Sequence, residues 1–383
     1  MTTNSSSAGL AGVIAGQTVL STVGQEGCGL TYRGYAIEDL AEHATFEEVA
    51  WLLLRGDLPT QRTLDEYRQR LKSLRELPSP LKSVLEQLPP TTHPMDVLRT
   101  GCSALGCLEP EGDTSDAMKR FDITDRLLAT FPSMLMYWHW FHSIGKRIET
   151  SSDADTIAGH ILHLLHGRPP APIHQRVLDV SLILYAEHEF NASTFTARVV
   201  TSTLADLYSA ITAAIGALRG PLHGGANEAA FDLINRFATP DQAERGVTEL
   251  LARKEKVMGF GHRVYRSEDP RSTVIQQWAK RLSDEVGDTR LYPVAERIEA
   301  VLRGEKKLFP NLDFYSAIAF HHLGVPTQFF TPLFVFSRTS GWAAHALEQR
   351  TDNRLIRPMG EYVGHALRLY LPIQSRLETR ESS

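Results

Sequence analysis

The pattern of apolar and polar positions predicts helices along most of the chain, and its clearest example is the segment TFEEVAWLLLRGDLP. Apolar side chains recur there at helical spacing. The residues of this stripe are Phe46, Val49, Ala50 and Leu53. Thr45 precedes them and Glu48 follows three residues later, which is the signature of a capping box. Gly56 and Pro59 supply stop signals, so we expect a helix between Thr45 and Gly56.

The same helical pattern recurs at 153–165, before RPPAP, and at 174–185. Apolar helices rich in small residues return at Thr331. The most apolar window, 127–141 (LLATFPSMLMYWHWF), is too short to cross a membrane, and it contains a proline, a serine and a histidine. It therefore predicts a buried core helix.

Strand patterning is confined to the N-terminal region. Residues 9–34 are rich in glycine and hold two short runs, QTVLSTV and LTYRG, around GQEGCG, which predicts a small β-hairpin. A phosphate-binding loop is the other interpretation, but the G-x-x-x-x-G-K-[ST] pattern is absent. Further along, strands and helices do not alternate and no fixed-period repeat occurs. The sequence therefore predicts an all-α fold with a minor N-terminal β-hairpin, and neither a Rossmann fold nor a solenoid.

The amino-acid composition changes after Gly220, at the glycine-rich loop GPLHGGANE, and the next hundred residues are more polar and charged. We expect a discontinuous architecture, with a large helical domain formed by 1–225 and 325–383 and a smaller helical domain inserted at 226–324. Glycines in the GPLHGG loop could absorb the torsion changes of a hinge between the two domains.

Composition and net charge indicate which classes of binding partner to expect. The chain has 383 residues, 42% hydrophobic and 22% charged, with a net charge of −5 and a pI near 6.3. Such a balance gives no overall field that attracts nucleic acid or an anionic membrane, so we expect neither as a partner. An anionic substrate would need locally placed Arg and His side chains. The N-terminus lacks a basic region before its apolar part, so we expect no signal peptide and a cytoplasmic protein.

The three cysteines, Cys28, Cys102 and Cys107, form no C-x-x-C pair, and their odd number is a poor basis for a disulfide framework. Cys102 and Cys107 lie in the apolar stretch GCSALGCL. We expect both to be buried thiols.

Candidate chemistry lies where the helical pattern is broken. His188 lies in AEHEFNASTF, His223 in GPLHGGANE, His262 in VMGFGHRVYRSEDPR and Asp313 in FPNLDFYSA. A histidine between a proline and two glycines buries no helix face, which weakens a purely structural role for His223. Asp313 stands among apolar and aromatic residues, where a raised pKa would suit proton transfer; a helix N-cap is the alternative.

Two other chemistries compete for these residues. A metal site would rest on HILHLLH, with His160, His163 and His166, but these positions spread over more than one helix face and no H-E-x-x-H or Cys partner accompanies them. We therefore expect no metal. A Ser-His-Asp hydrolase lacks its G-x-S-x-G motif.

Six segments, in order, resemble the citrate synthase family from Gly9 to about Gly364. They are GLAGVIAGQTVLSTV, LTYRGYAIEDLAEHATFEEVAWLLLRGDLPT, AEHEFNASTF, GPLHGGANE, GFGHRVYRSEDPR and FTPLFVFSRTSGWAAHALEQR. Within the family, AEHEFNASTFTARV, GALRGPLHGGANE and NRLIRP resemble the 2-methylcitrate synthase branch more closely. Because the match begins at Gly9, the resemblance implies the short dimeric form without the additional N-terminal domain of NADH-regulated members.

The resemblance implies roles for the catalytic residues. Asp313 would remove a proton from the α-carbon of an acyl-CoA, and His223 would hydrogen-bond the thioester oxygen as the enolate or enol forms. His262 would polarise the ketone of oxaloacetate and protonate the new alkoxide. Hydrolysis of the acyl-CoA intermediate would then release CoA and a tricarboxylate.

The resemblance also implies binding residues. Guanidinium groups suit carboxylates, and Arg271, Arg338 and Arg357 would bind oxaloacetate, with His188 as a further donor and Arg357 reaching in from the partner of a homodimer. For each arginine, a solvated surface charge is the alternative. The segment expected to contact CoA comprises Met258, Gly259, Phe260, Gly261 and Arg266. No permanently bound cofactor is implied, since the CoA thioester is a substrate.

The residues do not decide which acyl-CoA is the substrate. Propionyl-CoA and acetyl-CoA differ by one methylene, worth about 0.8 kcal/mol when buried, and such pockets discriminate by only about 10- to 200-fold. Branch resemblance favours propionyl-CoA, with some activity on acetyl-CoA. The alternatives are a citrate synthase that uses acetyl-CoA and, from another class, a helical protein that binds CoA esters or di-acids without turning them over.

Overall fold

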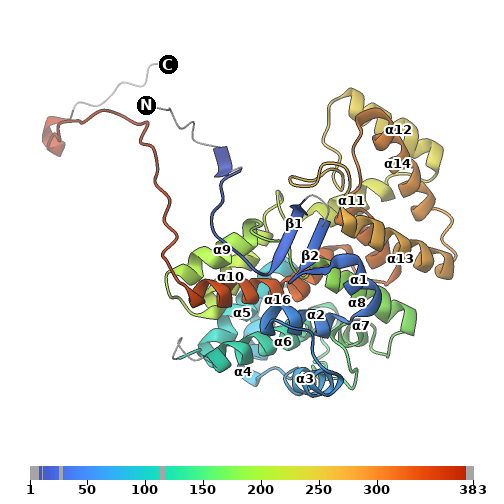
Figure 1. Ribbon diagram of the computed structural model, residues 1–383, viewed down its shortest axis with the longest axis horizontal. Coiled ribbons are helices and arrows are strands. Elements are labelled where there is room, and N and C mark those ends of the chain that lie inside the picture. The colour runs from blue at the N-terminus through green and yellow to red at the C-terminus, as the bar shows by residue number, and fades with distance from the viewer. Residues whose placement is uncertain (1–7, 11, 26–28, 113–116, 377–383) are drawn as a thin grey trace.

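The computed structural model describes residues 8–10, 12–25, 29–112 and 117–376. This part of the chain holds sixteen α-helices and one small sheet, so the all-α prediction is confirmed (Figure 1). None of its helices is long and apolar enough to span a membrane.

The predicted N-terminal hairpin is present. Strands β1 (Ser21–Gln25) and β2 (Gly29–Tyr32) pair antiparallel, and a two-residue strand β3 (Tyr35–Ala36) adds to β2. Ser21 lies opposite Tyr32 in the register, and the pairing is irregular between Val23 and Gln25. Residues 26–28, which include Cys28, lie outside the described ranges.

The helices of the first half include those that the sequence predicts. The capping box at α2 is present, with Glu48 accepting hydrogen bonds from the backbone N–H and hydroxyl of Thr45. Helix α6 contains the apolar window 127–141, which is buried over most of its length, as predicted for a core helix. The bounds are α1 Ile37–His43, α2 Phe46–Arg55, α3 Gln61–Ser73, α4 Ser79–Gln87, α5 Pro94–Leu108, α6 Ala117–Ile144, α7 Ile157–His166, α8 Pro172–Tyr185, α9 Ala192–Ser202 and α10 Leu207–Leu218.

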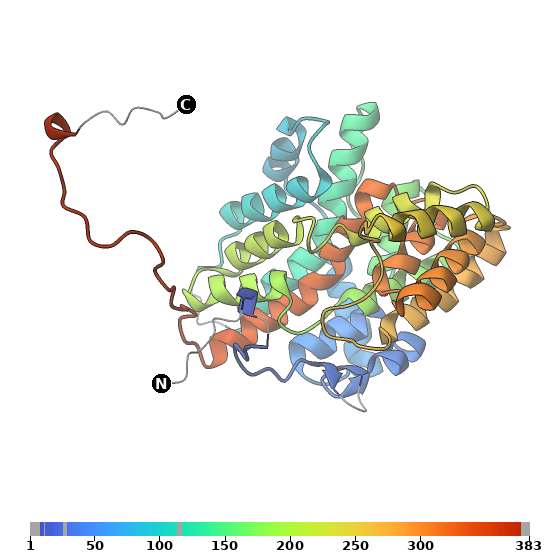
Figure 2. The same cartoon turned by 90° about the horizontal axis from the view of Figure 1, so that it is seen from above.

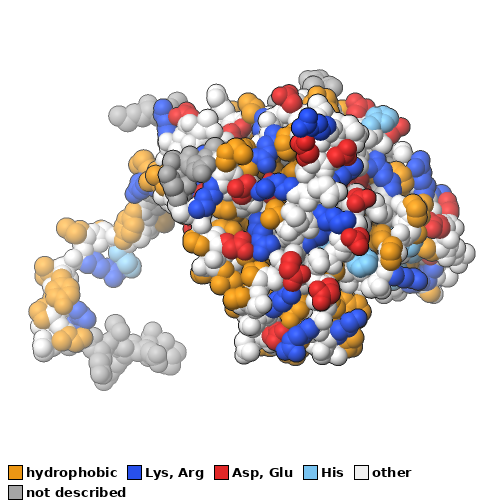
Figure 3. Space-filling view, turned by 90° about the horizontal axis from the view of Figure 1, so that it is seen from below, with side chains coloured by type: hydrophobic (Ala, Val, Ile, Leu, Met, Phe, Trp, Pro, Cys, Tyr) orange, Lys and Arg blue, Asp and Glu red, His pale blue; other side chains and the backbone are white. Residues whose placement is uncertain are grey.

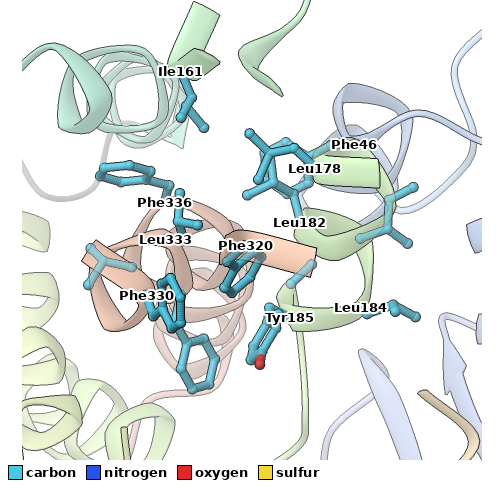
Figure 4. Packing of buried hydrophobic residues seen from close by; sticks show 14 of the residues in the cluster. Phe46, Ile161, Leu178, Leu182, Leu184, Tyr185, Phe320, Phe330, Leu333 and Phe336 are labelled. Carbon is cyan, nitrogen blue, oxygen red and sulfur yellow. The ribbon is translucent and has the colours of Figure 1, made fainter. Parts of the chain in front are cut away.

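Helix α16 (Phe330–Thr351) runs through the middle of these helices and packs on α2, α6, α8, α9 and α10. Most of its residues are buried, and Figure 4 shows Phe330, Leu333 and Phe336 in the shared core with Leu178 and Leu182 of α8. A helix that is buried over most of its surface suits this central position. Because α16 is packed on several sides, its buried polar residues, among them Arg338, are held in fixed positions.

Five helices form a group at one end of the molecule, in yellow to orange in Figures 1 and 2. Helix α12 packs on α14, and α15 packs on both α11 and α13. Helices α13 and α15 also contact α8, which joins this group to the rest. The bounds are α11 Ala226–Asn235, α12 Pro240–Ala252, α13 Pro270–Val286, α14 Leu291–Lys306 and α15 Leu312–His322.

Residues 352–376 leave the body of the molecule as an extended segment that ends in a 3-10 turn, η3 (Ile373–Ser375) (Figure 1). The segment carries exposed apolar side chains, which are visible along it in Figure 3. They are Leu355, Met359, Tyr362, Val363, Leu367, Leu369, Tyr370, Leu371 and Ile373. On the body, the same view shows acidic and basic side chains interspersed, in keeping with the absence of a single-sign field.

The prediction for the cysteines is half right. Cys102 is buried in α5, where its thiol lies 3.7 Å from the carbonyl of Tyr208. Cys107 is exposed. It follows the buried Leu105 by two residues, about 200° around the helix, so it faces solvent although the surrounding sequence is apolar.

Candidate active site

Four reactive side chains come from element ends and loops of distant sequence. His188 follows the C-terminus of α8, and His223 lies in the turn between α10 and α11. His262 lies in the loop between α12 and α13, and Asp313 lies in the first turn of α15. Gly224 beside His223 has no room for a side chain, because an added Cβ would lie 2.2 Å from the carbonyl of Leu218.

The carboxylate of Asp313 accepts a hydrogen bond of 2.6 Å from the hydroxyl of Tyr185. Burial raises the pKa of Asp313, and the Tyr185 bond opposes that rise. Asp313 is not the N-cap of α15: Asn311 is, and its side-chain oxygen accepts from the backbone N–H of Asp313. The N-cap alternative is therefore wrong, and the carboxylate is free of that structural task.

The GFGH loop is tied directly to the start of α15. Backbone N–H groups of Gly261 and Asn311 donate to the carbonyls of Phe309 and Gly259, and the side-chain amide of Asn311 donates to the carbonyl of Gly261. These bonds, 2.8 to 3.1 Å long, hold the residues just before His262 against those just before Asp313.

His262 has a defined tautomer. Its Nδ1 accepts from the backbone N–H groups of Val264 and Tyr265, at 3.1 and 3.3 Å, so in the neutral ring Nε2 carries the proton. Burial and the charge of Arg271 lower the pKa of His262 to about 4, which keeps the ring neutral at physiological pH. His262 therefore offers one N–H donor beside the ring of His188, 5.1 Å away.

His223 has the opposite tautomer. Its Nε2 accepts from the backbone N–H of Ser193 at 3.3 Å and lies 2.8 Å from the hydroxyl of the same residue. In the neutral ring, Nδ1 is then the donor. Burial and the charge of Arg338 lower the pKa of His223 to about 4. Trp342 donates to the Ser193 hydroxyl from α16 and so fixes this arrangement.

Aromatic contacts join His223 to Asp313. The ring of Phe334 lies 6.2 Å from that of His223 and 4.7 Å from that of Tyr185, which in turn bonds Asp313. Figure 4 shows Tyr185 at the margin of the core, with its hydroxyl pointing away from the labelled apolar residues. His223, His262 and the carboxylate of Asp313 thus lie in one region, at the junction of α8, α15 and α16.

Two arginines are buried in the same region. Arg271 makes a bidentate ion pair with Asp269, with Nε and one terminal nitrogen at 3.0 and 2.9 Å from its two oxygens. Burial alone would lower the pKa of Arg271, but Asp269 more than offsets it and the pKa rises. Arg338 donates through Nε to the carbonyl of Tyr185 at 2.6 Å and lies over the ring of Phe334. Burial lowers the pKa of Arg338 to about 10, so it stays charged at neutral pH. Neither arginine is a solvated surface charge.

His188 is buried, and its Nε2 lies 3.1 Å from the hydroxyl of Tyr265. Burial and the charge of Arg271 lower the pKa of His188 well below its ordinary value. It is therefore a neutral ring between two cationic side chains and His262.

Arg357 lies apart from these residues. It is exposed on the C-terminal segment that leaves the body, and the chain does not bring it to the other three oxaloacetate candidates. Within the single chain, the candidates for carboxylate binding that lie together are thus His188, Arg271 and Arg338.

The segment expected to contact CoA directly precedes His262 and is hydrogen-bonded to the residues before Asp313. Gly259 and Gly261 have φ of 85° and 74°, and an added Cβ at Gly259 would lie 3.0 Å from Phe314. Met258 and Phe260 are half-buried, and Arg266 is exposed. Arg266 also lines a cavity of about 1000 Å³ between the hairpin, α1 and α13, together with Glu38, Tyr265 and Trp278.

Three residues that the sequence did not single out complete the site: Tyr185, Ser193 and Asp269. Asp269 is the N-cap of α13, accepts from the backbone N–H of Leu312 at 3.2 Å, and so ties Arg271 to the turn that carries Asp313. The Asp-Pro step in SEDPR is a helix-start signal that could have drawn attention to it. Tyr185 and Ser193 carried no such signal.

Two of the three histidines named for a metal, His160 and His166, make other contacts. The two ring nitrogens of His160 lie 3.2 Å from the hydroxyl of Ser133 and 2.9 Å from that of Ser152. His166 contacts the carbonyl of Leu323. Among the described residues, no group of three or more His, Cys, Asp or Glu side chains could hold a metal ion.

Comparison with known proteins agrees with this geometry. Residues 9–359 match the family model described as "Citrate synthase, C-terminal domain". The chain belongs to the citrate synthase family. It is 56% identical to 2-methylcitrate synthase of Shewanella oneidensis over 96% of this chain and 98% of that one. It is 42% identical to citrate synthase 2 of Bacillus subtilis, again over 96% and 98%.

The fold of this family member is also shared with solved structures. Citrate synthase from Thermoplasma acidophilum, in a ternary complex with carboxymethyl coenzyme A and oxaloacetate, superposes with a TM-score of 0.89 at 33% identity, covering 96% of this chain and 98% of that one. Citrate synthase from Thermotoga maritima superposes with a TM-score of 0.86 at 36% identity, covering 97% and 99%.

Proposed function

We propose that the chain is a 2-methylcitrate synthase that condenses propionyl-CoA with oxaloacetate and water to give 2-methylcitrate and CoA. This is an acyl transfer in which the acyl group becomes an alkyl group, and it would place the enzyme in propionate catabolism. The observation that carries the proposal is the pair of neutral histidines with opposite tautomers, His223 and His262, beside the partly buried carboxylate of Asp313.

The first step would form the enol or enolate of the acyl-CoA. Asp313 takes the proton from the α-carbon, while the Nδ1–H of His223 donates to the thioester oxygen, where negative charge develops. A donor that is already oriented by Ser193 and neutral loses nothing to reorganisation during the step. The raised pKa of Asp313 makes its carboxylate a stronger base than an exposed one.

The second step would join the two substrates. The enol carbon attacks the ketone of oxaloacetate, and the Nε2–H of His262 polarises that ketone and gives its proton to the new alkoxide. Water then attacks the thioester, which breaks the carbon–sulfur bond and releases CoA as a thiol.

Oxaloacetate would lie against Arg271, Arg338 and His188, which are buried together. Guanidinium forks pair with carboxylates at such sites. We place Arg357 of the partner subunit in the same site, as part of a homodimer. The exposed apolar side chains of the segment that carries Arg357 support this, because a second chain would cover them.

The CoA moiety would run along Met258–Gly261, where glycines at positive φ expose backbone groups, with the charge of Arg266 near its phosphates. The chain would divide into a large domain of 1–225 with 325–383 and a small domain of 226–324. Asp313 and His262 lie in the small domain. Asp313 contacts Tyr185 of the large domain and His262 contacts His188, so the two domains already meet at the site. Opening of the domains would admit the substrates, and closure would exclude water from the enolate. The expectation of a cytoplasmic protein stays a prediction.

The choice of propionyl-CoA is supported by the 56% identity to a 2-methylcitrate synthase. The second candidate is a citrate synthase using acetyl-CoA, favoured by the 42% identity to citrate synthase 2. The test is release of free thiol from each acyl-CoA at saturating oxaloacetate. A higher kcat/KM for propionyl-CoA is expected; a large preference for acetyl-CoA would reverse the assignment.

A binding protein without turnover is separated by a second measurement. Asp313→Ala is expected to keep oxaloacetate binding, seen as a thermal shift. Its turnover should fall by at least about a thousandfold, because the variant lacks the positioned carboxylate that takes the α-proton. Asp241→Ala is the matched control, since Asp241 occupies the exposed first turn of another helix. Wild-type rates in Asp313→Ala would refute the mechanism.

A further inference from the structure

The turn that carries His188 is organised by its neighbour Glu187, a fully buried carboxylate outside the catalytic set. Three donors converge on Oε1 of Glu187: the hydroxyl of Ser21 at 3.0 Å, the backbone N–H of Glu189 at 2.6 Å and Nε2 of His345 at 2.8 Å. The turn needs such support, because Glu189 has a φ of 51°, in the left-handed region.

The donor from His345 is itself fixed. Its Nδ1 lies 3.0 Å from a terminal nitrogen of Arg198, which can only donate, so Nε2 carries the proton given to Glu187. Arg198 also pairs with Glu348 at 2.6 Å, and Glu348 accepts from the backbone N–H of Val19. A continuous polar network thus runs from the N-terminal segment through α9 and α16 to the His188 turn.

The N-terminal hairpin holds the same turn from the other side. Ser21 and Tyr32 lie opposite each other in the strand register, and both reach Glu187. The hydroxyl of Tyr32 donates to the carbonyl of Glu187 at 3.0 Å and accepts from its N–H at 3.2 Å. The hairpin therefore anchors both the side chain and the backbone of the residue before His188.

The second carboxylate oxygen of Glu187, Oε2, is buried and has no hydrogen-bond partner. A Cβ added to Gly341 would lie 2.4 Å from this oxygen and 3.3 Å from Cδ of Arg338, so the carboxylate and the arginine flank the same small space. Burial would raise the pKa of Glu187, but donation from His345 and the charge of Arg338 hold it below its usual value.

We propose that Glu187 is a positioning residue of the oxaloacetate subsite, which acts by holding the turn that presents His188 through hydrogen bonds from His345, Ser21 and Glu189. The inference rests on the proposed condensation with oxaloacetate. It assigns the N-terminal hairpin a role in substrate binding, although the hairpin contributes no residue to the catalytic set.

The test compares two variants in steady-state kinetics. Glu187→Ala removes the acceptor, and KM for oxaloacetate is expected to rise about tenfold or more while KM for the acyl-CoA stays within about twofold. Glu187→Gln keeps an acceptor oxygen for the same three donors, so it should restore most of the affinity for oxaloacetate. Equal impairment of both variants would overturn the proposal, because it would assign the effect to charge.

Glu47→Ala is the matched control. Glu47 is also buried, accepts a backbone hydrogen bond from Ile157 at 2.6 Å and has one unpartnered oxygen, but it lies on α2 and contacts none of the candidate site residues. It should lower stability without changing KM for oxaloacetate. An equal rise in both Ala variants would reduce the role of Glu187 to stability and refute the inference.

Ser21→Ala tests the positioning role of Glu187 if Glu187→Ala does not fold. It removes one donor to Glu187 and one acceptor of the Glu189 N–H, and KM for oxaloacetate should rise about two- to fivefold. An unchanged KM in this folded variant would contradict the proposal. A wild-type protein that releases no thiol from either acyl-CoA would overturn the proposed function instead.

Discussion

The hydroxyl of Tyr185 lies 2.6 Å from the carboxylate of Asp313, and the carbonyl of the same tyrosine accepts from the guanidinium of Arg338. One residue at the end of α8 therefore contacts both the proposed base and a proposed oxaloacetate ligand. Under the proposed mechanism, a change at Tyr185 would therefore affect both α-proton removal and the binding of oxaloacetate.

Removal of this hydroxyl should change the pH dependence of the reaction. The Tyr185 hydrogen bond lowers the pKa of Asp313, so Tyr185→Phe should raise that pKa and move the acidic limb of kcat/KM for the acyl-CoA to higher pH. Tyr67→Phe, which removes a similar buried hydroxyl from Asp125, is the control and should leave the limb in place. A limb that stays put or moves down would contradict the assignment of Asp313 as base.

Substitution of Asp269 should affect both stability and oxaloacetate binding, although Asp269 is not one of the residues proposed to touch the substrate. Asp269→Asn leaves the buried Arg271 without its counter-charge, which typically costs about 3–5 kcal/mol. KM for oxaloacetate should rise as well, because Arg271 loses its orientation. Asp179→Asn breaks a partly buried ion pair, with Arg176, and serves as the comparison. It should lower the midpoint of urea unfolding without raising KM for oxaloacetate.

The lowered histidine pKa values predict acid destabilisation. The pKa values of His223 and His262 are about 4 when folded and near 6.5 when unfolded, so the unfolded state binds more protons in that window. Stability from these residues is present above pH 6.5 and is lost as the pH falls toward 4. In His262→Gln, the urea midpoint should fall less between pH 7 and pH 5 than in wild type; an equal fall would show that His262 titrates normally.

The sharing of Arg357 between subunits can be tested by complementation. Arg357→Gln and Asp313→Ala should each be impaired alone. If the two variants are unfolded and refolded together, about half of the dimers are hybrids with one intact site, which restores about a quarter of the wild-type activity. Recovery of none would mean that Arg357 acts within its own chain or not at all.

Closure of the two proposed domains predicts a more compact protein with substrate. Small-angle scattering should show a smaller radius of gyration at saturating oxaloacetate than without it. Arg338→Gln is the control, since it should weaken oxaloacetate binding and reduce the change at the same concentration. Identical profiles for the free and saturated wild type would argue against closure.

Local signals in the sequence determined much of this protein. The Thr45–Glu48 capping box, the hairpin around GQEGCG and the apolar helix at 127–141 depend on neighbours along the chain, and all three are confirmed. The ordered motifs also pointed to His223, His262 and Asp313 as the catalytic residues, and that assignment stays a prediction.

Only the tertiary structure decided what surrounds these residues. Asp269 joins Arg271 to the backbone of Leu312, and Ser193 fixes the tautomer of His223, through contacts between segments 30 or more residues apart. Cys107 faces solvent although its neighbours are apolar, because the orientation of α5 decides which face is covered. Burial, charge and hydrogen-bond direction depend on distances between elements, and a pattern along the chain does not contain those distances.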